Sequence, residues 1–189
     1  MTGFQRTIAT LGGFSGALAL VLAVADVGEA GLVMIVGSIL LAAAGLRHYL
    51  GLMPEARIDL AASLAGMIML LTLLDGEMPS ASWPFLVSCW LIGWLAVEKS
   101  LAARELSQAY STVISLAVPV FFGAWIIFVW EVLTVGLQVP TVLLPPPSMI
   151  AVRFAASTSI LWADFQQTFI KAALSLSLIH ISEPTRPVL

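Results

Sequence analysis

Acidic side chains beside apolar segments are the groups of this chain best suited to binding ions or protons. Asp26 and Glu131 are two such residues, and a carboxylate buried in lipid is costly and usually functional. Both lie near the ends of expected helices, however, where a carboxylate reaches water, so we favour solvated positions for them. A membrane-embedded enzyme or an ion-conducting protein that uses Asp26, Glu131 and His48 remains an alternative.

Other reactive side chains are few. His48 lies beside Arg47 in a predicted turn, and His180 is the only other histidine, so the chain offers no metal-binding constellation. Cys89 has no second cysteine to pair with and is expected to pack as a small residue. We find no nucleophile–base pair, no glycine-rich phosphate loop and no basic nucleic-acid surface. We therefore expect no enzyme activity, catalytic residue, cofactor, bound metal or nucleic-acid partner.

Composition indicates an integral membrane protein. Of the 189 residues, 60% are hydrophobic and 10% are charged, and the mean hydropathy is +1.02, which is far from the balance of a soluble domain. A spanning helix needs roughly 20 apolar residues. The sequence predicts an all-α membrane fold with about five transmembrane helices, two of them short, at residues 7–25, 30–46, 60–74, 83–97 and 112–138.

Basic residues set the expected orientation of these helices. Arg6 precedes the first stretch, Arg47 and Arg57 lie between the second and third, and Lys99 and Arg104 lie between the fourth and fifth. Loops rich in Lys and Arg stay in the cytoplasm, and the intervening turns carry only acids. We expect a multi-pass protein whose N-terminus is cytoplasmic and whose segment after the fifth stretch is external.

Two patterns of spacing within the stretches indicate helix packing. Gly12 and Gly16 form a small-xxx-small pair, which is typical of a close helix seam. We expect this pair to pack against other helices of the same chain rather than to form a dimer motif. Trp83, Trp90 and Trp94 form an aromatic stripe, for which interfacial anchoring and packing are favoured over a ligand-binding box.

The segment after the fifth stretch predicts an external surface element. Three prolines at residues 145–147 cannot continue a helix and favour an extended spacer. Ser148 is expected to cap a new helix over residues 149–156, which is mostly apolar and suited to lying at the membrane interface. A second helix follows and grows more apolar towards Leu174, as a helix entering the membrane does.

Three motifs in this region occur in a characteristic order: Trp130-Glu131, then Leu144-Pro145-Pro146-Pro147, then Thr168-Phe169-Ile170-Lys171. This order resembles the permease subunits of binding-protein-dependent ABC importers, in the branch associated with nitrate, sulfonate, taurine and related solutes. The resemblance covers residues 104–175. Lys171 stands where the family has Arg, and Ser175 lies near the position of an expected glycine.

The resemblance implies a domain organisation. Residues 1–97 would be a four-helix N-terminal membrane extension, and residues 98–111 a cytoplasmic connector. Residues 112–175 would be the first core helix and external segment of a truncated permease domain. The partners implied for the full-length protein are a cytoplasmic ATPase subunit, a periplasmic substrate-binding protein and a second permease copy, in the bacterial inner membrane.

The last residues have a different character. Residues 176–186 resemble the conceptual translation of a sequencing-library adapter, so residues 176–189 are expected to be a non-native tail. The family's ATPase-docking loop, with its Glu-Ala-Ala-like start, does not occur after Ser175. The sequence therefore predicts a permease fragment that is inactive in transport. A complete small membrane scaffold or accessory transporter subunit is the second alternative.

Overall fold

The computed structural model describes residues 3–25, 29–50, 52, 56–74, 78–104 and 108–182. These residues form helices and the turns between them, and the described part of the chain contains no strand. The all-α fold class predicted from the sequence is thus confirmed. The helices are α1 (Gly3–Ala25), α2 (Glu29–Tyr49), α3 (Ala56–Leu71), α4 (Ser82–Arg104), α5 (Gln108–Gly136), α6 (Pro147–Ala156) and α7 (Thr158–Ser182).

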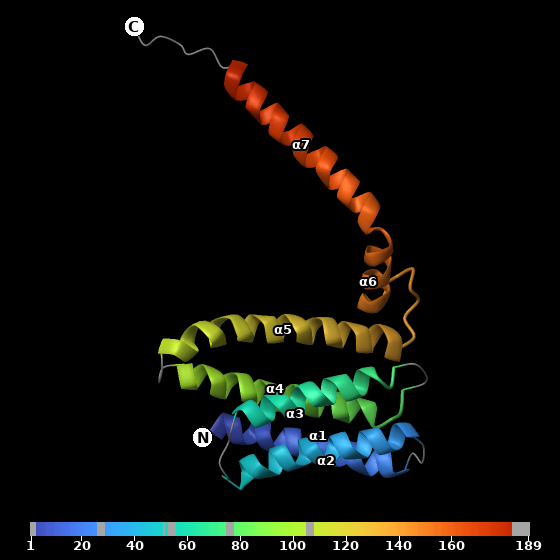
Figure 1. The fold of residues 1–189 in the computed structure, drawn as a ribbon. Helices are drawn as coiled ribbons and strands as arrows, with labels where there is room; N and C mark the ends of the chain where they lie inside the picture. Colours follow the sequence, from blue (N-terminus) through green and yellow to red (C-terminus); the bar gives the residue numbers. More distant parts are fainter. Residues whose placement is uncertain are drawn as a thin grey trace.

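Helices α1 to α5 lie side by side and alternate in direction, while α6 and α7 leave this bundle at the end where α5 finishes (Figure 1). Helix α4 lies at the centre of the contacts, because it packs against α1, α2, α3 and α5. Helix α7 contacts α6 and points away from the bundle. The chain therefore consists of a packed bundle and a projecting arm.

Among the residues that the structure describes, four helices are long and apolar enough to cross a membrane. These candidate spans are Gly3–Ala25, Gly31–Tyr49, Ser82–Leu101 and Ser115–Gly136. Helix α3 has only 16 residues. Residues 72–74, which were expected to continue this helix, form turns instead. A fifth span therefore stays a prediction.

The interior of the bundle is built from apolar side chains and small residues. Phe85, Met34 and Leu41 are fully buried, and Cys89 is buried beside them in the core cluster, in agreement with a packing role. Where side chains are absent, helices approach closely: a Cβ added to Gly45 of α2 would lie 2.6 Å from the backbone nitrogen of Gly13 in α1. This approach needs glycine at position 45, and it is tight at position 13, where an added Cβ would lie 3.3 Å from the Gly45 Cα.

The Gly12–Gly16 pair packs within the chain, as expected. Both glycines are buried in α1. A Cβ on Gly12 would lie 3.2 Å from Ile92 of α4, and one on Gly16 would lie 2.9 Å from the backbone nitrogen of Ala42 in α2. The seam is reinforced by a hydrogen bond of 2.8 Å that the Ser88 hydroxyl donates to the carbonyl oxygen of Gly12.

Residues 98–111 are largely helical. Helix α4 continues through residues 98–104, and α5 begins at Gln108, so residues 105–107 alone lie outside the described helices here. Residues such as Glu, Lys, Leu, Ala and Arg are good helix formers, which explains why α4 extends past the apolar stretch. Helix α7 likewise runs through residues 176–182 of the expected tail, and residues 183–189 lie outside the described part.

Helix α5 ends in a Schellman motif. The N–H of Val139 donates to the carbonyl of Thr134 at 2.9 Å, and the N–H of Gln138 donates to the carbonyl of Val135 at 3.0 Å. Gln138 has a φ of 51°, the left-handed conformation that glycine usually supplies at this position. The motif turns the chain out of α5 towards the proline segment.

The prediction that Ser148 caps α6 is wrong. The N-cap residue is Pro146, which has no side-chain cap hydrogen bond, and α6 already begins at Pro147. Proline is favoured at the first helical position, because its fixed φ suits a helix and its missing N–H needs no partner there. Ser148 therefore lies inside the first turn, where its side chain is used differently.

Candidate functional site

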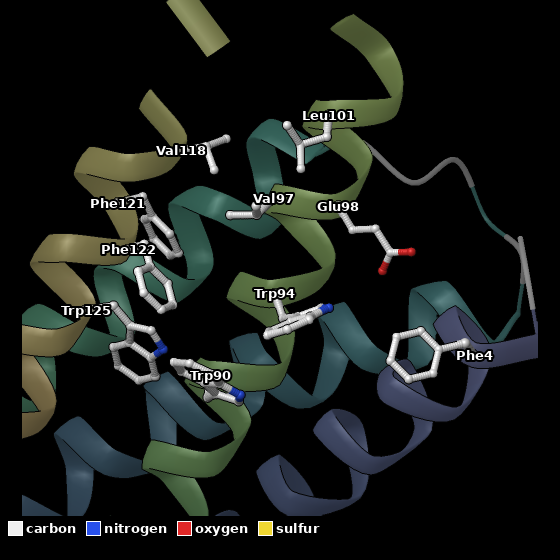
Figure 2. A pocket seen from close by; sticks show the side chains of 10 residues that line it. All are labelled: Phe4, Trp90, Trp94, Val97, Glu98, Leu101, Val118, Phe121, Phe122 and Trp125. Carbon is white, nitrogen blue, oxygen red and sulfur yellow. The ribbon is translucent and has the colours of Figure 1, made fainter. Parts of the chain in front are cut away.

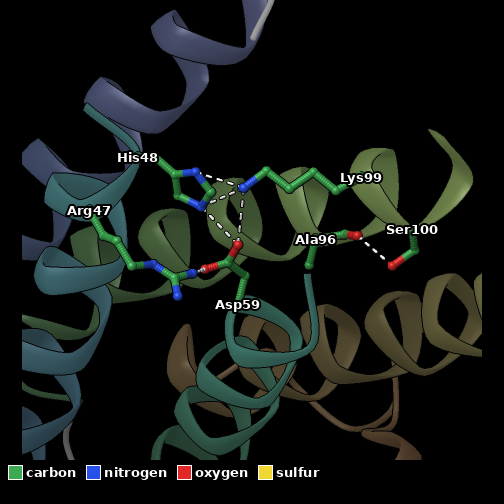
Figure 3. A network of polar contacts seen from close by, with 6 residues as sticks. All are labelled: Arg47, His48, Asp59, Ala96, Lys99 and Ser100. Atoms are coloured by element: carbon green, nitrogen blue, oxygen red, sulfur yellow. Dashed lines mark hydrogen bonds and ion pairs between the residues drawn. The ribbon is translucent and has the colours of Figure 1, made fainter. Parts of the chain in front are cut away.

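A cluster of charged side chains lies where α2 ends, α3 begins and α4 approaches its end (Figure 3). Asp59 of α3 is its centre. One carboxylate oxygen of Asp59 pairs with the Arg47 guanidinium of α2. The other lies 2.8 Å from Nε2 of His48 and 3.3 Å from Nζ of Lys99, which comes from α4. The cluster thus connects three helices through one carboxylate.

His48 completes the network between Lys99 and Asp59. The Lys99 ammonium lies 2.7 Å from Nδ1 of His48 and 3.0 Å from its Nε2. An ammonium group only donates, so it donates to Nδ1, and Nε2–H donates to the Asp59 carboxylate. We assign this neutral tautomer from the hydrogen-bond pattern.

Burial makes the charges of this cluster strongly interdependent. The side chains of Asp59 and His48 are fully buried, and those of Arg47 and Lys99 are 20% and 12% exposed. Asp59 lies in α3, outside the four candidate spans. Burial raises the pKa of its carboxyl group, and the adjacent Arg47 guanidinium opposes that shift. With His48 neutral, one carboxylate faces two cations, so loss of the carboxylate would leave two like charges together.

This cluster was not predicted from the sequence. Arg47 and Lys99 served in the prediction only as markers of orientation, and His48 was considered only as a member of the ion-site alternative with Asp26 and Glu131. The usable signal was Asp59, an acid at the start of an apolar stretch on the side where the other loops are basic. The arrangement joins the ends of three helices through one buried carboxylate, which is the geometry of a structural ion-pair network.

Glu131 forms a second polar site at the other end of the bundle. Its carboxylate accepts a hydrogen bond of 2.8 Å from the backbone N–H of Ser148 and one of 2.6 Å from the Ser148 hydroxyl. Glu131 is half-buried near the end of α5, and Ser148 is exposed in α6. The contact ties the start of α6 to α5, so this acid has a protein partner.

Of the three residues of the ion-site alternative, the structure describes two, His48 and Glu131. Asp26 lies outside the described residues, as does the side chain of His180. His48 lies at the end of α2 and Glu131 near the end of α5, which are opposite ends of the bundle (Figure 1). Those two residues therefore do not share a site. Within the described residues there is no group of three or more His, Cys, Asp or Glu side chains that could hold a metal ion.

Of the three tryptophans in the predicted stripe, two line one cavity and the third does not. Trp90 and Trp94 line a cavity between α4, α5 and the start of α1, whereas Trp83 is not among its lining residues (Figure 2). Glu98 lies on the same face of α4, two turns after Trp90 and one turn after Trp94. Glu98 was predicted only as the first residue of the connector at residues 98–111, although its spacing of four residues from Trp94 places both on one helix face.

Comparison with known proteins adds no relative: no family model, curated protein or solved structure matches this chain.

Proposed function

We propose that this chain is part of the permease subunit of a binding-protein-dependent ABC importer for a small solute such as nitrate, a sulfonate or taurine. In this proposal, α1 to α4 are an N-terminal extension. Helix α5 is the first core helix, α6 lies at the external membrane interface, and α7 begins the next core helix. The observation that carries the proposal is the pair of hydrogen bonds from Ser148 to Glu131.

That contact brings two of the ordered motifs together in space. The acid of Trp130-Glu131 and the residue that follows the three prolines are 17 positions apart in the sequence. They nevertheless meet, because the Schellman turn and the proline segment return the chain to α5. Two of the three motifs that support the family resemblance are therefore parts of one structural unit, which holds α6 beside the end of α5.

The arm formed by α7 also supports the proposal. Trp162, Phe165 and Phe169 stack along it, with ring centroids 5.6 Å apart in each successive pair, and all three are more than half exposed. An apolar face of this kind needs lipid or other helices to cover it. Later core helices of a permease would provide such cover.

A membrane location is supported by the outer surface of the bundle. Large apolar side chains such as Leu32, Val21 and Ile68 are each more than 60% exposed on it, which a soluble monomer rarely tolerates over a large area. We propose a multi-pass protein of the bacterial inner membrane with a cytoplasmic N-terminus, because Arg47, Arg57 and Lys99 belong to helix ends on the side where α1 begins.

Orientation can be measured directly with introduced cysteines. Cys89 is fully buried, so the parent chain should not react with a membrane-impermeant maleimide. Gly3→Cys and Val142→Cys place thiols at opposite ends, and Val142 is 95% exposed. We expect labelling from outside intact spheroplasts at position 142 alone. Labelling at position 3 alone would contradict the proposed orientation.

The implied mechanism of the whole importer is alternating access, in which a binding protein delivers solute and a separate ATPase drives the switch. The present 189 residues contain no docking loop of the expected Glu-Ala-Ala type, so we propose that they do not transport by themselves. Uptake of radiolabelled taurine or sulfonate by cells that express only this chain would contradict that statement.

The deciding experiment is to sequence the source genomic DNA through the codon for Ser175. We expect the reading frame to continue into further membrane helices and an ATPase-docking loop, beside genes for an ATPase and a binding protein. A frame that encodes residues 176–189 and then stops would remove the importer mechanism.

A structural accessory protein is the second candidate, and the charge cluster favours it. Asp59 joins α2, α3 and α4 through buried ion pairs, so three of the first four helices are linked to one another independently of α5. A protein expressed from residues 1–104 alone that folds and binds a known transporter subunit would support this role.

A further inference from the structure

A largely apolar cavity with one acidic side chain in its wall lies between α4, the first half of α5 and the beginning of α1 (Figure 2). Its volume is about 410 Å³. Aromatic rings form most of its wall, and Glu98 is its charged lining residue. The size is within the range of small-molecule sites in proteins.

The aromatic wall is assembled from two helices. The ring centroids of Trp90 and Trp94 on α4 are 6.0 Å apart with an angle of 49° between the rings. Trp90 stacks on Trp125 of α5, with centroids 5.0 Å apart. Trp94 is 45% exposed and Phe122 is 51% exposed, so these two rings are accessible from outside the bundle. Indole rings carry a negative face and are the best aromatic partners of a cation.

Glu98 carries a carboxylate that forms no ion pair within the described residues. Its Oε1 accepts a hydrogen bond of 3.1 Å from the amide of Gln5, whereas its buried Oε2 has no hydrogen-bond partner within the described residues. The ion pairs in that part of the chain all use Asp59. The neighbouring Lys99 is directed to that cluster, away from this carboxylate.

An unpartnered carboxylate oxygen at an aromatic wall is costly unless a cation approaches it. Figure 2 shows the carboxylate of Glu98 on the side of the cavity where Trp94 and Phe4 lie. We propose that this cavity binds an apolar organic cation of the quaternary ammonium or phosphonium class. The charge would lie between Glu98 and the tryptophan faces, and the apolar substituents would fill the rest of the cavity.

A lipid acyl chain is the competing occupant. It would make apolar contacts with the wall of the cavity but would leave the Glu98 oxygen without a partner. An uncharged acyl chain also gains no cation–π interaction with the indole rings. The two occupants differ in one measurable property, which is whether binding depends on positive charge.

The test uses the whole chain in lipid nanodiscs and tetraphenylphosphonium as the probe. Binding is followed by quenching of tryptophan fluorescence and by calorimetry, with triphenylphosphine oxide as a neutral analogue of similar shape. We expect the phosphonium ion to bind the parent chain at least tenfold more tightly than the neutral analogue. Equal affinities in the parent chain would overturn the proposal without any variant and would indicate an apolar crevice for lipid.

Variants then assign the site. Glu98→Gln should weaken phosphonium binding at least tenfold and leave binding of the neutral analogue unchanged. Trp94→Leu should weaken it severalfold, and Trp94→Phe should weaken it less. The matched controls Asp164→Asn and Trp162→Leu, on the exposed arm α7, should bind as the parent does. Circular dichroism establishes that each variant is folded. Phosphonium binding that is unchanged in folded Glu98→Gln protein would place the ion elsewhere and reject the site.

Discussion

Glu131 accepts two hydrogen bonds from Ser148, at 2.8 Å from its backbone N–H and at 2.6 Å from its hydroxyl. Ser148 is in the first turn of α6, where backbone N–H groups have no acceptor within the helix. The N-cap residue, Pro146, has no side chain that can supply one. Glu131 therefore caps α6 from another helix, and its negative charge lies at the positive end of the α6 dipole.

Glu131→Ala should release the first turn of α6. We expect a loss of about 1 kcal/mol in the local stability of that turn, or roughly fivefold faster exchange of the Ser148 amide hydrogen. Ser148→Ala removes only the hydroxyl hydrogen bond and should have a smaller effect. Amide hydrogen exchange read by mass spectrometry on peptides from residues 145–156 tests this. Exchange that is the same in both variants and the parent would show that the contact does not hold α6.

Asp59→Asn should destabilise the bundle by about 3 kcal/mol, because Arg47 and Lys99 would then face each other without a carboxylate. Adding Lys99→Met should restore part of that loss. Cys89 is fully buried, so a thiol-reactive dye reports unfolding on heating in detergent. Asp164→Asn, on exposed α7, is the matched control and should change stability by less than about 0.5 kcal/mol. A double variant less stable than Asp59→Asn alone would contradict the electrostatic explanation.

Gly45→Ala should separate α1 from α2. Its Cβ would lie 2.6 Å from the Gly13 nitrogen and 2.9 Å from the Ala9 carbonyl oxygen, and backbone atoms cannot move aside as a flexible side chain does. We expect Gly45→Ala to lower the free energy of unfolding by about 1–3 kcal/mol. Gly123→Ala in α5 is the control, because nothing lies within 4 Å of its added Cβ, and it should gain up to about 1 kcal/mol from helix propensity. Thermal unfolding followed with the same thiol-reactive dye distinguishes the expected loss of stability in Gly45→Ala from the expected gain in Gly123→Ala.

Gln138→Gly should stabilise the end of α5. Gln138 holds a φ of 51°, which costs a residue with a Cβ about 1 kcal/mol relative to glycine. The amide hydrogens of residues 138 and 139 should exchange more slowly in the glycine variant than in the parent chain. Gln138→Ala keeps the Cβ and should show no such gain, so equal protection in both variants would argue against the conformational explanation.

The helices of the bundle could be predicted from the sequence because apolar length and helix-forming residues act locally. The expected first stretch, residues 7–25, ends at the same residue as α1, and the expected fifth stretch, residues 112–138, overlaps α5 over nearly its whole length. The intrachain packing of Gly12 and Gly16 was predicted as well. These features depend on composition and periodicity, which a single sequence contains.

The polar contacts could not be predicted in the same way, because each joins residues that are distant in the sequence. Asp59 reaches Lys99 across 40 positions, and Glu98 accepts from Gln5 across 93. Helix boundaries alone do not fix how two helices are rotated about their axes, and a rotation of one residue would separate either pair. Ser148 was assigned the wrong role because a proline at the first helical position moved the start of α6 forward by two residues.

The central position of α4 has a consequence for biogenesis. Helices α1, α2 and α3 are synthesised first, yet the surfaces of α1 and α3 that meet α4 have no partner until α4 itself leaves the ribosome. The buried hydroxyl of Ser88 and the ammonium of Lys99 reach their acceptors only at that moment. During translation, the nascent hairpin of α1 and α2 therefore has an incomplete interface, and the arrival of α4 is the step that completes the packing of the N-terminal helices.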